Sequence, residues 1–298
     1  MRRLSLLSLL LVLPLLLHAA DKKFEKKFSV SSDGLLTVRA DLGDVSIKGT
    51  SSNEVNIVVN MRGSLGDLDD YEITANQVGN TIELRGKGKN DSWFKFNLDD
   101  VDIKYVVEIP EKFSIDASTA GGDVAVSHVS GKIQTETSGG DIVLQQLSGE
   151  VLVETSGGDI HATEMKGNFK GTTSGGDIIV TSVTGNISVE TSGGDIRIKD
   201  VGGMVSAQTS GGDITIALSG ANKGIKAETS GGDIDVLATK NIQANLDAST
   251  SGGSVVCSLP IALAGEIDES RVQGTLNGGG ELIHVQTSGG DIRIKAAE

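Results

Sequence analysis

The chain has 298 residues, a formal net charge of −14 at pH 7, 40 glycines and an aromatic content of 3%. Such an acidic surface repels nucleic acid and anionic lipid, so we exclude nucleic-acid binding. The single cysteine, Cys257, cannot form a disulfide within the chain, so stability has to come from a packed core.

The first 20 residues have the pattern of a secretory signal peptide. Two arginines precede a mostly apolar run, Leu4–Leu17, and small residues follow at Ala19 and Ala20. The run is too short for a comfortable membrane span, although an uncleaved anchor helix is the alternative. We therefore predict that residues 1–20 are removed. The mature protein would be periplasmic or extracellular, with no integral membrane span.

Residues 21–117 differ in composition from the rest of the chain, because eight of the nine aromatic residues lie before residue 114. We predict that they form irregular coils that cap one end of the repeats described next. The charged segment Gly86–Asp100, with Trp93, Phe94 and Phe96, predicts a loop or edge hairpin with a local core; contact with a partner is the alternative. Alternating apolar residues predict strands at 44–49, 54–59, 81–84 and 102–109.

From Ser118 to Ile292 the phrase Thr-Ser-Gly-Gly-Asp-Ile keeps returning, mostly every 18 residues. Ser254 takes the aspartate position once, and the final copy follows after a further 37 residues, close to two repeats. A short fixed period is typical of a repeat architecture. The repeated aspartates are Asp123, Asp141, Asp159, Asp177, Asp195, Asp213, Asp233 and Asp291.

One repeat contains two short runs of alternating apolar residues, exemplified by Ile142 and Leu144, then Val151 and Val153. These predict two strands per repeat and leave no helix for a crossover. Stacked as successive coils, each strand would pair with its copy about 4.8 Å away. We predict an all-β fold, a single-stranded parallel β-helix or β-solenoid over residues 118–298. About nine steps from Asp123 to Asp291 would make a rod of roughly 43 Å.

The corner residues have predicted roles as well. The glycine pair is expected to supply positive φ angles, and Gly158 to face inward where no side chain fits. The aspartate between the glycines and the strand would point outward and accept N–H groups of the turn. Cys257 is expected inward, buried and inert. Threonines one position before the phrase's serine predict a buried hydroxyl ladder at 137, 155, 191, 209 and 229.

Two motifs resemble a known family. Ile109-Pro110-Glu111-Lys112 leads into the repeats, and Gly274–Gly280 leads into Thr287–Ile294. These segments resemble the bacterial domain family of unknown function labelled "putative adhesin", and are similar to the head domains called GIN. The resemblance covers nearly all of residues 30–295. It implies an extracytoplasmic, right-handed, single-chain β-solenoid, and it brings no catalytic residue or cofactor.

The outward aspartate row is the main site candidate, and its residues are weak candidates for a cation. Calcium takes six to eight oxygen ligands, and one aspartate per coil supplies few of them, so structural turn capping is favoured. A calcium-stabilised secreted β-roll is the alternative, and it predicts that a chelator lowers the melting temperature. The candidates are Asp123, Asp141, Asp159, Asp177, Asp195, Asp213 and Asp233.

Other chemistry has weaker support. His128, His161 and His284 are far apart in sequence, so a zinc or copper site is not expected. Enzymes that cleave acidic polysaccharides need a unique cluster of charged groups. The irregular segment 259–286 offers one, with an acidic pair able to do glycoside chemistry, although a surface loop is the favoured interpretation. That cluster is Glu266, Asp268, Glu269 and Arg271.

The sequence thus predicts a non-enzymatic, extracytoplasmic β-solenoid without a cofactor. Regularly spaced serine, threonine and charged side chains on flat sheets would suit an adhesin, or a binding or scaffold protein of the cell envelope. The expected partner is an envelope polymer, another envelope protein or a second copy of the chain. A calcium-stabilised roll and, less favoured, a polysaccharide-active enzyme are the alternatives.

Overall fold

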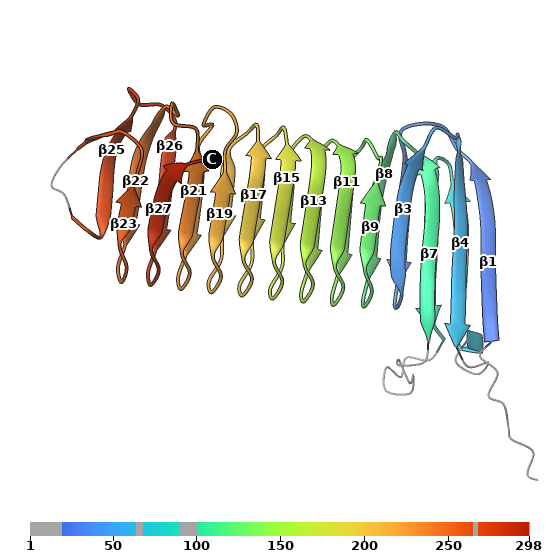
Figure 1. Cartoon of the computed structure of the whole chain (residues 1–298). Coiled ribbons are helices and arrows are strands. Elements are labelled where there is room, and N and C mark those ends of the chain that lie inside the picture. The colour runs from blue at the N-terminus through green and yellow to red at the C-terminus, as the bar shows by residue number, and fades with distance from the viewer. Residues whose placement is uncertain (1–19, 64–67, 90–100, 265–267, 298) are drawn as a thin grey trace, which may run out of the picture.

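The computed structural model shows an all-β solenoid made of two long sheets (Figure 1). Sheet A contains 13 strands and sheet B contains 14. The structure describes residues 20–63, 68–89, 101–264 and 268–297.

Three predictions fall on residues outside these ranges. They are the signal peptide before Ala20, the aromatic segment with Trp93, Phe94 and Phe96, and the candidate Glu266. In the described ranges, no helix has both the length and the apolar character needed to cross a membrane.

Each central coil contributes one strand to each sheet. In the coil that begins at Asp141, β11 (Ile142–Ser148) lies in sheet A and β12 (Val151–Thr155) lies in sheet B. Each pairs in parallel with its copy one coil on, so that Ile142 is opposite Ile160. The predicted parallel solenoid is therefore confirmed. The other central strands are β8 (Phe113–Thr119), β9 (Val124–Ser127), β10 (Ile133–Thr137), β13 (Ile160–Lys166), β14 (Phe169–Thr172), β15 (Ile178–Val183), β16 (Ile187–Glu190), β17 (Ile196–Val201), β18 (Val205–Gln208), β19 (Ile214–Ala217), β20 (Ile225–Thr229) and β21 (Ile234–Ala238).

The core fills the space between the two sheets. Inward positions alternate along most of the strands, and Ile142, Leu144 and Val153 have no exposed surface. Burying one such side chain contributes roughly 1.5–3 kcal/mol. Because each coil repeats the same inward positions, the core extends unbroken along the rod.

The glycine pair at each corner is required for space rather than for backbone angle. In the central repeats only Gly122 of these glycines has a φ in the left-handed region, so the prediction of positive φ at each pair was wrong. A Cβ at Gly158 would lie 2.0 Å from the carbonyl oxygen of Gly140 in the preceding coil. The inward, crowded position predicted for this glycine is confirmed, and backbone of the neighbouring coil is what crowds it.

Buried threonines link each corner to the coil before it. The Thr155 hydroxyl donates to the Gly140 carbonyl at 2.9 Å and accepts the Gly158 N–H at 3.3 Å. The predicted ladder is confirmed, but it runs through backbone groups rather than from hydroxyl to hydroxyl. Equivalent pairs of bonds occur at Thr137, Thr173, Thr191, Thr209, Thr229, Thr250 and Thr287.

At the N-terminal end the coils are stacked out of chain order. The first coil packs directly against the coil of β8 and β9, and the later coil of β6 and β7 lies outside it. Antiparallel strands then close the stack, with β1 beyond β4 in sheet A and β5 beyond β6 in sheet B. The strands of this end are β1 (Ala20–Ser29), β2 (Gly34–Ala40), β3 (Asp44–Thr50), β4 (Glu54–Gly63), β5 (Tyr71–Val78), β6 (Thr81–Gly88) and β7 (Asp102–Pro110).

A second exchange of order occurs at the C-terminal end. The last coil, β26 and β27, lies between the coil of β20 and β21 and that of β22 and β23 (Figure 1). The predicted sequential stacking was therefore wrong here. Asp291 follows Asp233 directly, and Asp123 and Asp291 are seven coil steps apart rather than nine. The strands are β22 (Ala244–Thr250), β23 (Val255–Cys257), β24 (Ile261–Leu263), β25 (Arg271–Leu276), β26 (Leu282–Thr287) and β27 (Ile292–Ala296).

The antiparallel strands β24 and β25 explain this exchange. β25 pairs with β22 on its outer side, so the coil of β22 and β23 becomes the last parallel coil. A turn with positive φ at Asn277, Gly278 and Gly279 then returns the chain to the inner side. Cys257 faces the core as predicted but is only half-buried, because β23 is the final strand of sheet A.

Candidate functional site

The aspartate row runs along the corner where sheet B leads into sheet A. Each carboxylate accepts the backbone N–H of the aspartate one coil on, for example Asp159 N–H to Asp141 Oδ1 at 2.8 Å. The row begins at Asp44, and it ends where Asp291 accepts the N–H and the hydroxyl of Ser254. The carboxylates therefore act as caps that hold neighbouring corners in register.

Two arginines neutralise parts of this row. Arg197 contacts Asp177 at 3.2 Å and Asp195 at 2.7 Å, and Arg293 contacts both Asp233 and Asp291 at 2.8 Å. Carboxylates one coil apart repel each other by about 1 kcal/mol in water, and a guanidinium between two of them offsets that repulsion. The charge of the row is thus balanced at two places along the rod.

Hydrogen bonds also tune the acidity of the row at its C-terminal end. The N–H of Asp291, and then Arg293, lower the pKa of Asp233. The N–H and hydroxyl of Ser254 lower the pKa of Asp291. The carboxylates of Asp233 and Asp291 therefore remain ionised to a lower pH than a free aspartate, because the folded corner donates hydrogen bonds to them.

The same geometry limits what the row can do with a cation. One oxygen of each carboxylate already accepts a backbone N–H, and neighbouring aspartates belong to different coils. Among the described residues, no group of three or more His, Cys, Asp or Glu side chains is placed to hold a metal ion. The row is therefore a chain of single carboxylates rather than a set of converging ligands.

The outer face of sheet A carries a second continuous feature, which we call the outer strip. It consists of one outward side chain from each of seven neighbouring strands, placed in register by the strand pairing. Val106 is 43% exposed and Val143 is 46% exposed, which is high for large apolar side chains. The strip is Val58, Val106, Ser46, Ala125, Val143, His161 and Ile179.

The outer strip lies between two polar rows. The aspartate row borders it on one side, and Lys48, Ser127, Gln145 and Thr163 follow one another on the other side. Six strand spacings separate its first and last members, which is about 29 Å. Beyond Ile179 the next residue in register is Arg197, so the strip has a defined end.

The other predicted candidates are dispersed. His128 occupies a corner, His161 belongs to the outer strip, and His284 lies in sheet B between Asp247, at 3.3 Å, and Glu228, at 3.9 Å. In the acidic segment 259–286, the Asp268 carboxylate accepts the N–H of Ser270, and this hydrogen bond lowers the pKa of Asp268.

Arg271 does not complete a catalytic cluster with Asp268. It contacts Asp247 in sheet B at 3.2 Å instead. The described part of the segment therefore consists of a capped turn followed by a surface ion pair.

Two features of this surface were missed at the sequence level, although the sequence contains their signals. Arg197 and Arg293 stand two residues after an aspartate, which puts them on the same side of the strand. The outer strip is the third position of each repeat, where Val143, His161 and Ile179 follow one another at 18-residue spacing.

A model of one protein family, described as Toastrack DUF4097, matches residues 35–295 of this chain. No curated protein matches the chain significantly.

The matches to three solved structures each cover 93% of the chain. A putative adhesin from Bacteroides fragilis NCTC 9343 is 14% identical, with 97% of its chain covered and a TM-score of 0.46. A putative lipid binding protein from Parabacteroides distasonis ATCC 8503 is 12% identical, with the same coverage and TM-score. A putative cell adhesion protein from Clostridium sporogenes ATCC 15579 is 13% identical, covered in full, with a TM-score of 0.25. No function follows for this chain from these likenesses.

Proposed function

The chain belongs to the Toastrack DUF4097 family, and we propose that it is a non-enzymatic binding or scaffold protein of the cell envelope. Its partner, an envelope polymer or another envelope protein, would lie along the outer strip of sheet A. The export that this role requires rests on the predicted signal peptide. The adhesin label and the likeness to GIN head domains remain part of the same proposal.

The outer strip is the observation that carries this proposal. Five of its seven side chains are Val, Ala or Ile, and the other two are Ser46 and His161. Val106 and Val143 are exposed and Val58, Ala125 and Ile179 are partly exposed, so the strip leaves apolar surface in water, and such surface marks interaction sites. Its flatness follows from the parallel sheet beneath it, because each side chain stands one strand spacing from the next. A long, shallow surface of this kind suits an extended or flat partner better than a small molecule.

The distribution of charged groups supports a role without catalysis. The described aspartates of the row repeat one environment coil after coil, and each is held by a backbone N–H. Catalysis instead needs groups with distinct environments that converge on one reacting atom. Repetition favours contact with a polymer or a surface whose own groups repeat.

The proposal is tested by introducing negative charges on the strip, with a matched control. Val143→Glu together with Ile179→Glu places two carboxylates on the strip, in β11 and β15. Leu152→Glu together with Ser188→Glu places the same two charges on the outer face of sheet B, in β12 and β16 of the same coils. Co-sedimentation of each purified variant with an envelope fraction measures binding.

The strip variant is expected to lose about tenfold or more in binding, since a desolvated carboxylate is costly at an apolar contact. The sheet B variant is expected to bind like the unmodified protein. Circular dichroism and melting curves check that both variants remain folded. Equal binding by the two variants, or loss in the sheet B variant alone, would exclude the outer strip as the binding surface.

A further inference from the structure

One corner of the solenoid has a segment missing, because the last coil is stacked out of order. In the central coils each strand of sheet A is followed, after a corner, by the strand of sheet B that belongs to the same step of the stack; β11 and β12 are one example. β21 instead continues through residues 239–243 to β22, past β26, which lies between β20 and β22. β26 is entered from the turn at residues 277–281. Within the described chain, no segment therefore joins β21 to β26.

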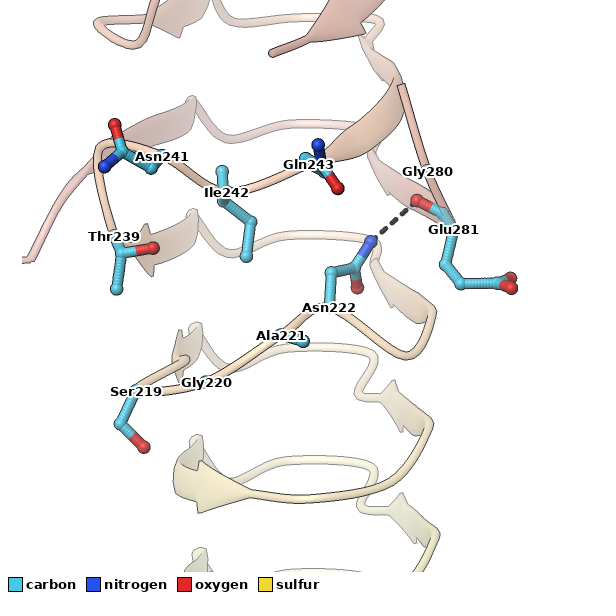
Figure 2. Close-up of a pocket in the computed structure, with 10 residues that line it drawn as sticks. All are labelled: Ser219, Gly220, Ala221, Asn222, Thr239, Asn241, Ile242, Gln243, Gly280 and Glu281. Atoms are coloured by element: carbon cyan, nitrogen blue, oxygen red, sulfur yellow. Dashed lines mark hydrogen bonds between the residues drawn. The ribbon is translucent and has the colours of Figure 1, made fainter. Parts of the chain in front are cut away.

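A groove of about 520 Å³ marks this place, between residues 219–222 and residues 239–243 (Figure 2). The side chains of Asn222 and Ile242 extend toward each other across it. Asn222 Nδ2 donates to the backbone carbonyl of Glu281 at 2.6 Å, which closes one end. Ile242 is 2% exposed and forms an apolar floor, whereas most of the remaining lining is polar or small.

The walls of the groove differ from a regular corner in their backbone hydrogen bonds. At a central corner, Ser148 N–H donates to Val129 and Gly149 N–H donates to Lys166, each bond joining neighbouring coils. In the groove, the N–H and C=O groups of residues 219–221 make no such bond within the described chain. On the opposite wall the N–H of Ile242 donates to the Thr239 carbonyl within the same turn, and Asn277 Nδ2 donates to the carbonyls of Lys240 and Ile242 at 3.1 and 2.9 Å. Residues 219–221 and the N–H groups of Asn241 and Gln243 therefore make no backbone hydrogen bond within the described chain, unlike the groups of a regular corner.

We propose that this groove binds an extended segment of a partner polypeptide, which takes the place of the missing corner. Such a segment would complete the backbone ladder between the two walls, the principle of strand addition at an open sheet edge. The volume lies within the range of about 300–1,000 Å³ that is usual for binding pockets.

The lining also indicates what the segment contains. The buried residue of a regular corner, such as Leu147 or Val183, faces inward, and an equivalent apolar side chain would pack on Ile242. Where the segment lies closest to the backbone of the two walls, it would need glycine or another small residue. No aromatic side chain lines the groove, so a sugar ring has nothing to stack on. This site is separate from the outer strip and does not depend on it.

A peptide copied from a regular corner of the chain tests the proposal. Residues 181–187 (Thr-Ser-Val-Thr-Gly-Asn-Ile), acetylated and amidated, mimic the missing segment. Titrated at up to millimolar concentration into the isotopically labelled full chain, the peptide is expected to shift the amide signals of residues 219–222 and 239–243 in a saturable way. The same peptide with alternate backbone nitrogens methylated is expected to cause no such shifts, because it cannot donate to the walls.

Two tryptophan substitutions separate the groove from the rest of the surface. A Cβ at Gly220 or at Gly139 meets nothing within 4 Å, so both substitutions are compatible with folding. Gly220→Trp fills the groove and is expected to weaken peptide binding about tenfold or more. Gly139→Trp, at a distant corner, is expected to leave binding unchanged.

Several results would overturn the proposal. They are an absence of saturable shifts, shifts confined to other residues, binding that survives in Gly220→Trp, or equal binding of the methylated peptide. A cell-wall oligosaccharide that shifts these loops while the peptide does not would overturn it as well. Self-association of the unmodified protein that Gly220→Trp abolishes would support the groove and identify a second copy as the donor of the segment.

Discussion

The central coils and the two ends of the solenoid are built from the same units but stack them differently. In the centre, coils that follow one another in the chain also lie next to one another in space. At each end one coil is displaced, so that β2 and β3 lie inside β6 and β7, and β26 and β27 lie inside β22 and β23. Antiparallel strands close the stack only beyond these displaced coils.

The difference shows what the repeat determines and what it leaves open. Asp291 makes the same bonds to its neighbours as Asp213 does, although the coil of Asp291 arrives from a different part of the chain. The corner bonds alone therefore do not determine which coil follows which in the stack. Order is determined instead by the segments that leave the repeat, such as β25 and the glycine turn after it, and the groove exists because of that change of order.

The largest expected effect comes from crowding a central corner. Gly158→Ala places a Cβ 2.0 Å from a carbonyl of the neighbouring coil, where the contacts are backbone on rigid strands. We expect a loss of about 3 kcal/mol in the free energy of unfolding, measured by denaturant titration. Gly157→Ala is the matched control, because its nearest neighbour is 3.7 Å away. We expect it to stay within about 0.5 kcal/mol of the unmodified protein.

The same substitution at Gly220 sharpens the comparison between centre and end. No atom lies within 4 Å of its Cβ position, so Gly220→Ala is expected to be nearly neutral. Similar decreases in the free energy of unfolding for Gly158→Ala and Gly220→Ala would contradict the view that the groove is an open corner.

A smaller effect is expected from the buried threonines. Thr155→Val removes a hydroxyl that bonds Gly140 and Gly158, and it leaves both backbone groups unsatisfied. We expect a loss of about 1–3 kcal/mol. Thr135 is buried just as deeply, but its hydroxyl has no hydrogen-bond partner. Thr135→Val is therefore expected to be neutral or stabilising, and a loss there equal to that of Thr155→Val would disprove the hydrogen-bond account.

Much of the central fold could be predicted from the sequence because its signals are local. The alternation around Ile142 and Val151 gave the strands, and the 18-residue period gave the parallel register. The inward threonine and outward aspartate followed from counting residues along a strand. The crowded glycine was predicted for the same reason, although its φ angle was not, because crowding from a neighbouring coil does not require a positive φ.

The order of the end coils could not be predicted in this way. Asp233, Asp291 and Ser254 stand in equivalent corners, so their local sequence does not say which corner lies next to which. The pairing of β25 with β22, on which the order depends, involves residues far apart in the chain. The groove follows from that pairing, and of its lining residues only Gly280 belongs to a motif that the sequence analysis identified.

An acid titration examines the C-terminal end of the aspartate row. The folded-state pKa of Asp233 lies below its unfolded value of about 3.9, so this group stabilises the fold above that pH. The stabilisation is lost as the pH falls through the lowered folded-state pKa. Asp233→Asn keeps an oxygen that can accept the Asp291 N–H but cannot titrate. Below pH 4 we expect the melting temperature of this variant to fall less steeply with pH than that of the unmodified protein. The same pH dependence in both proteins would contradict the stabilising role of the Asp233 carboxylate.

The smallest expected effect concerns cations, and it applies to centre and end alike. Calcium needs six to eight oxygens, whereas each described carboxylate of the row has one oxygen bonded to the next coil, and some also contact Arg197 or Arg293. We expect that neither a chelator nor added calcium changes the melting temperature. A lower melting temperature in the presence of a chelator would instead support the calcium-stabilised roll. If that decrease disappeared in Asp141→Asn but not in Asp233→Asn, the cation would lie where no arginine balances the row, because only there is a free carboxylate oxygen left for it.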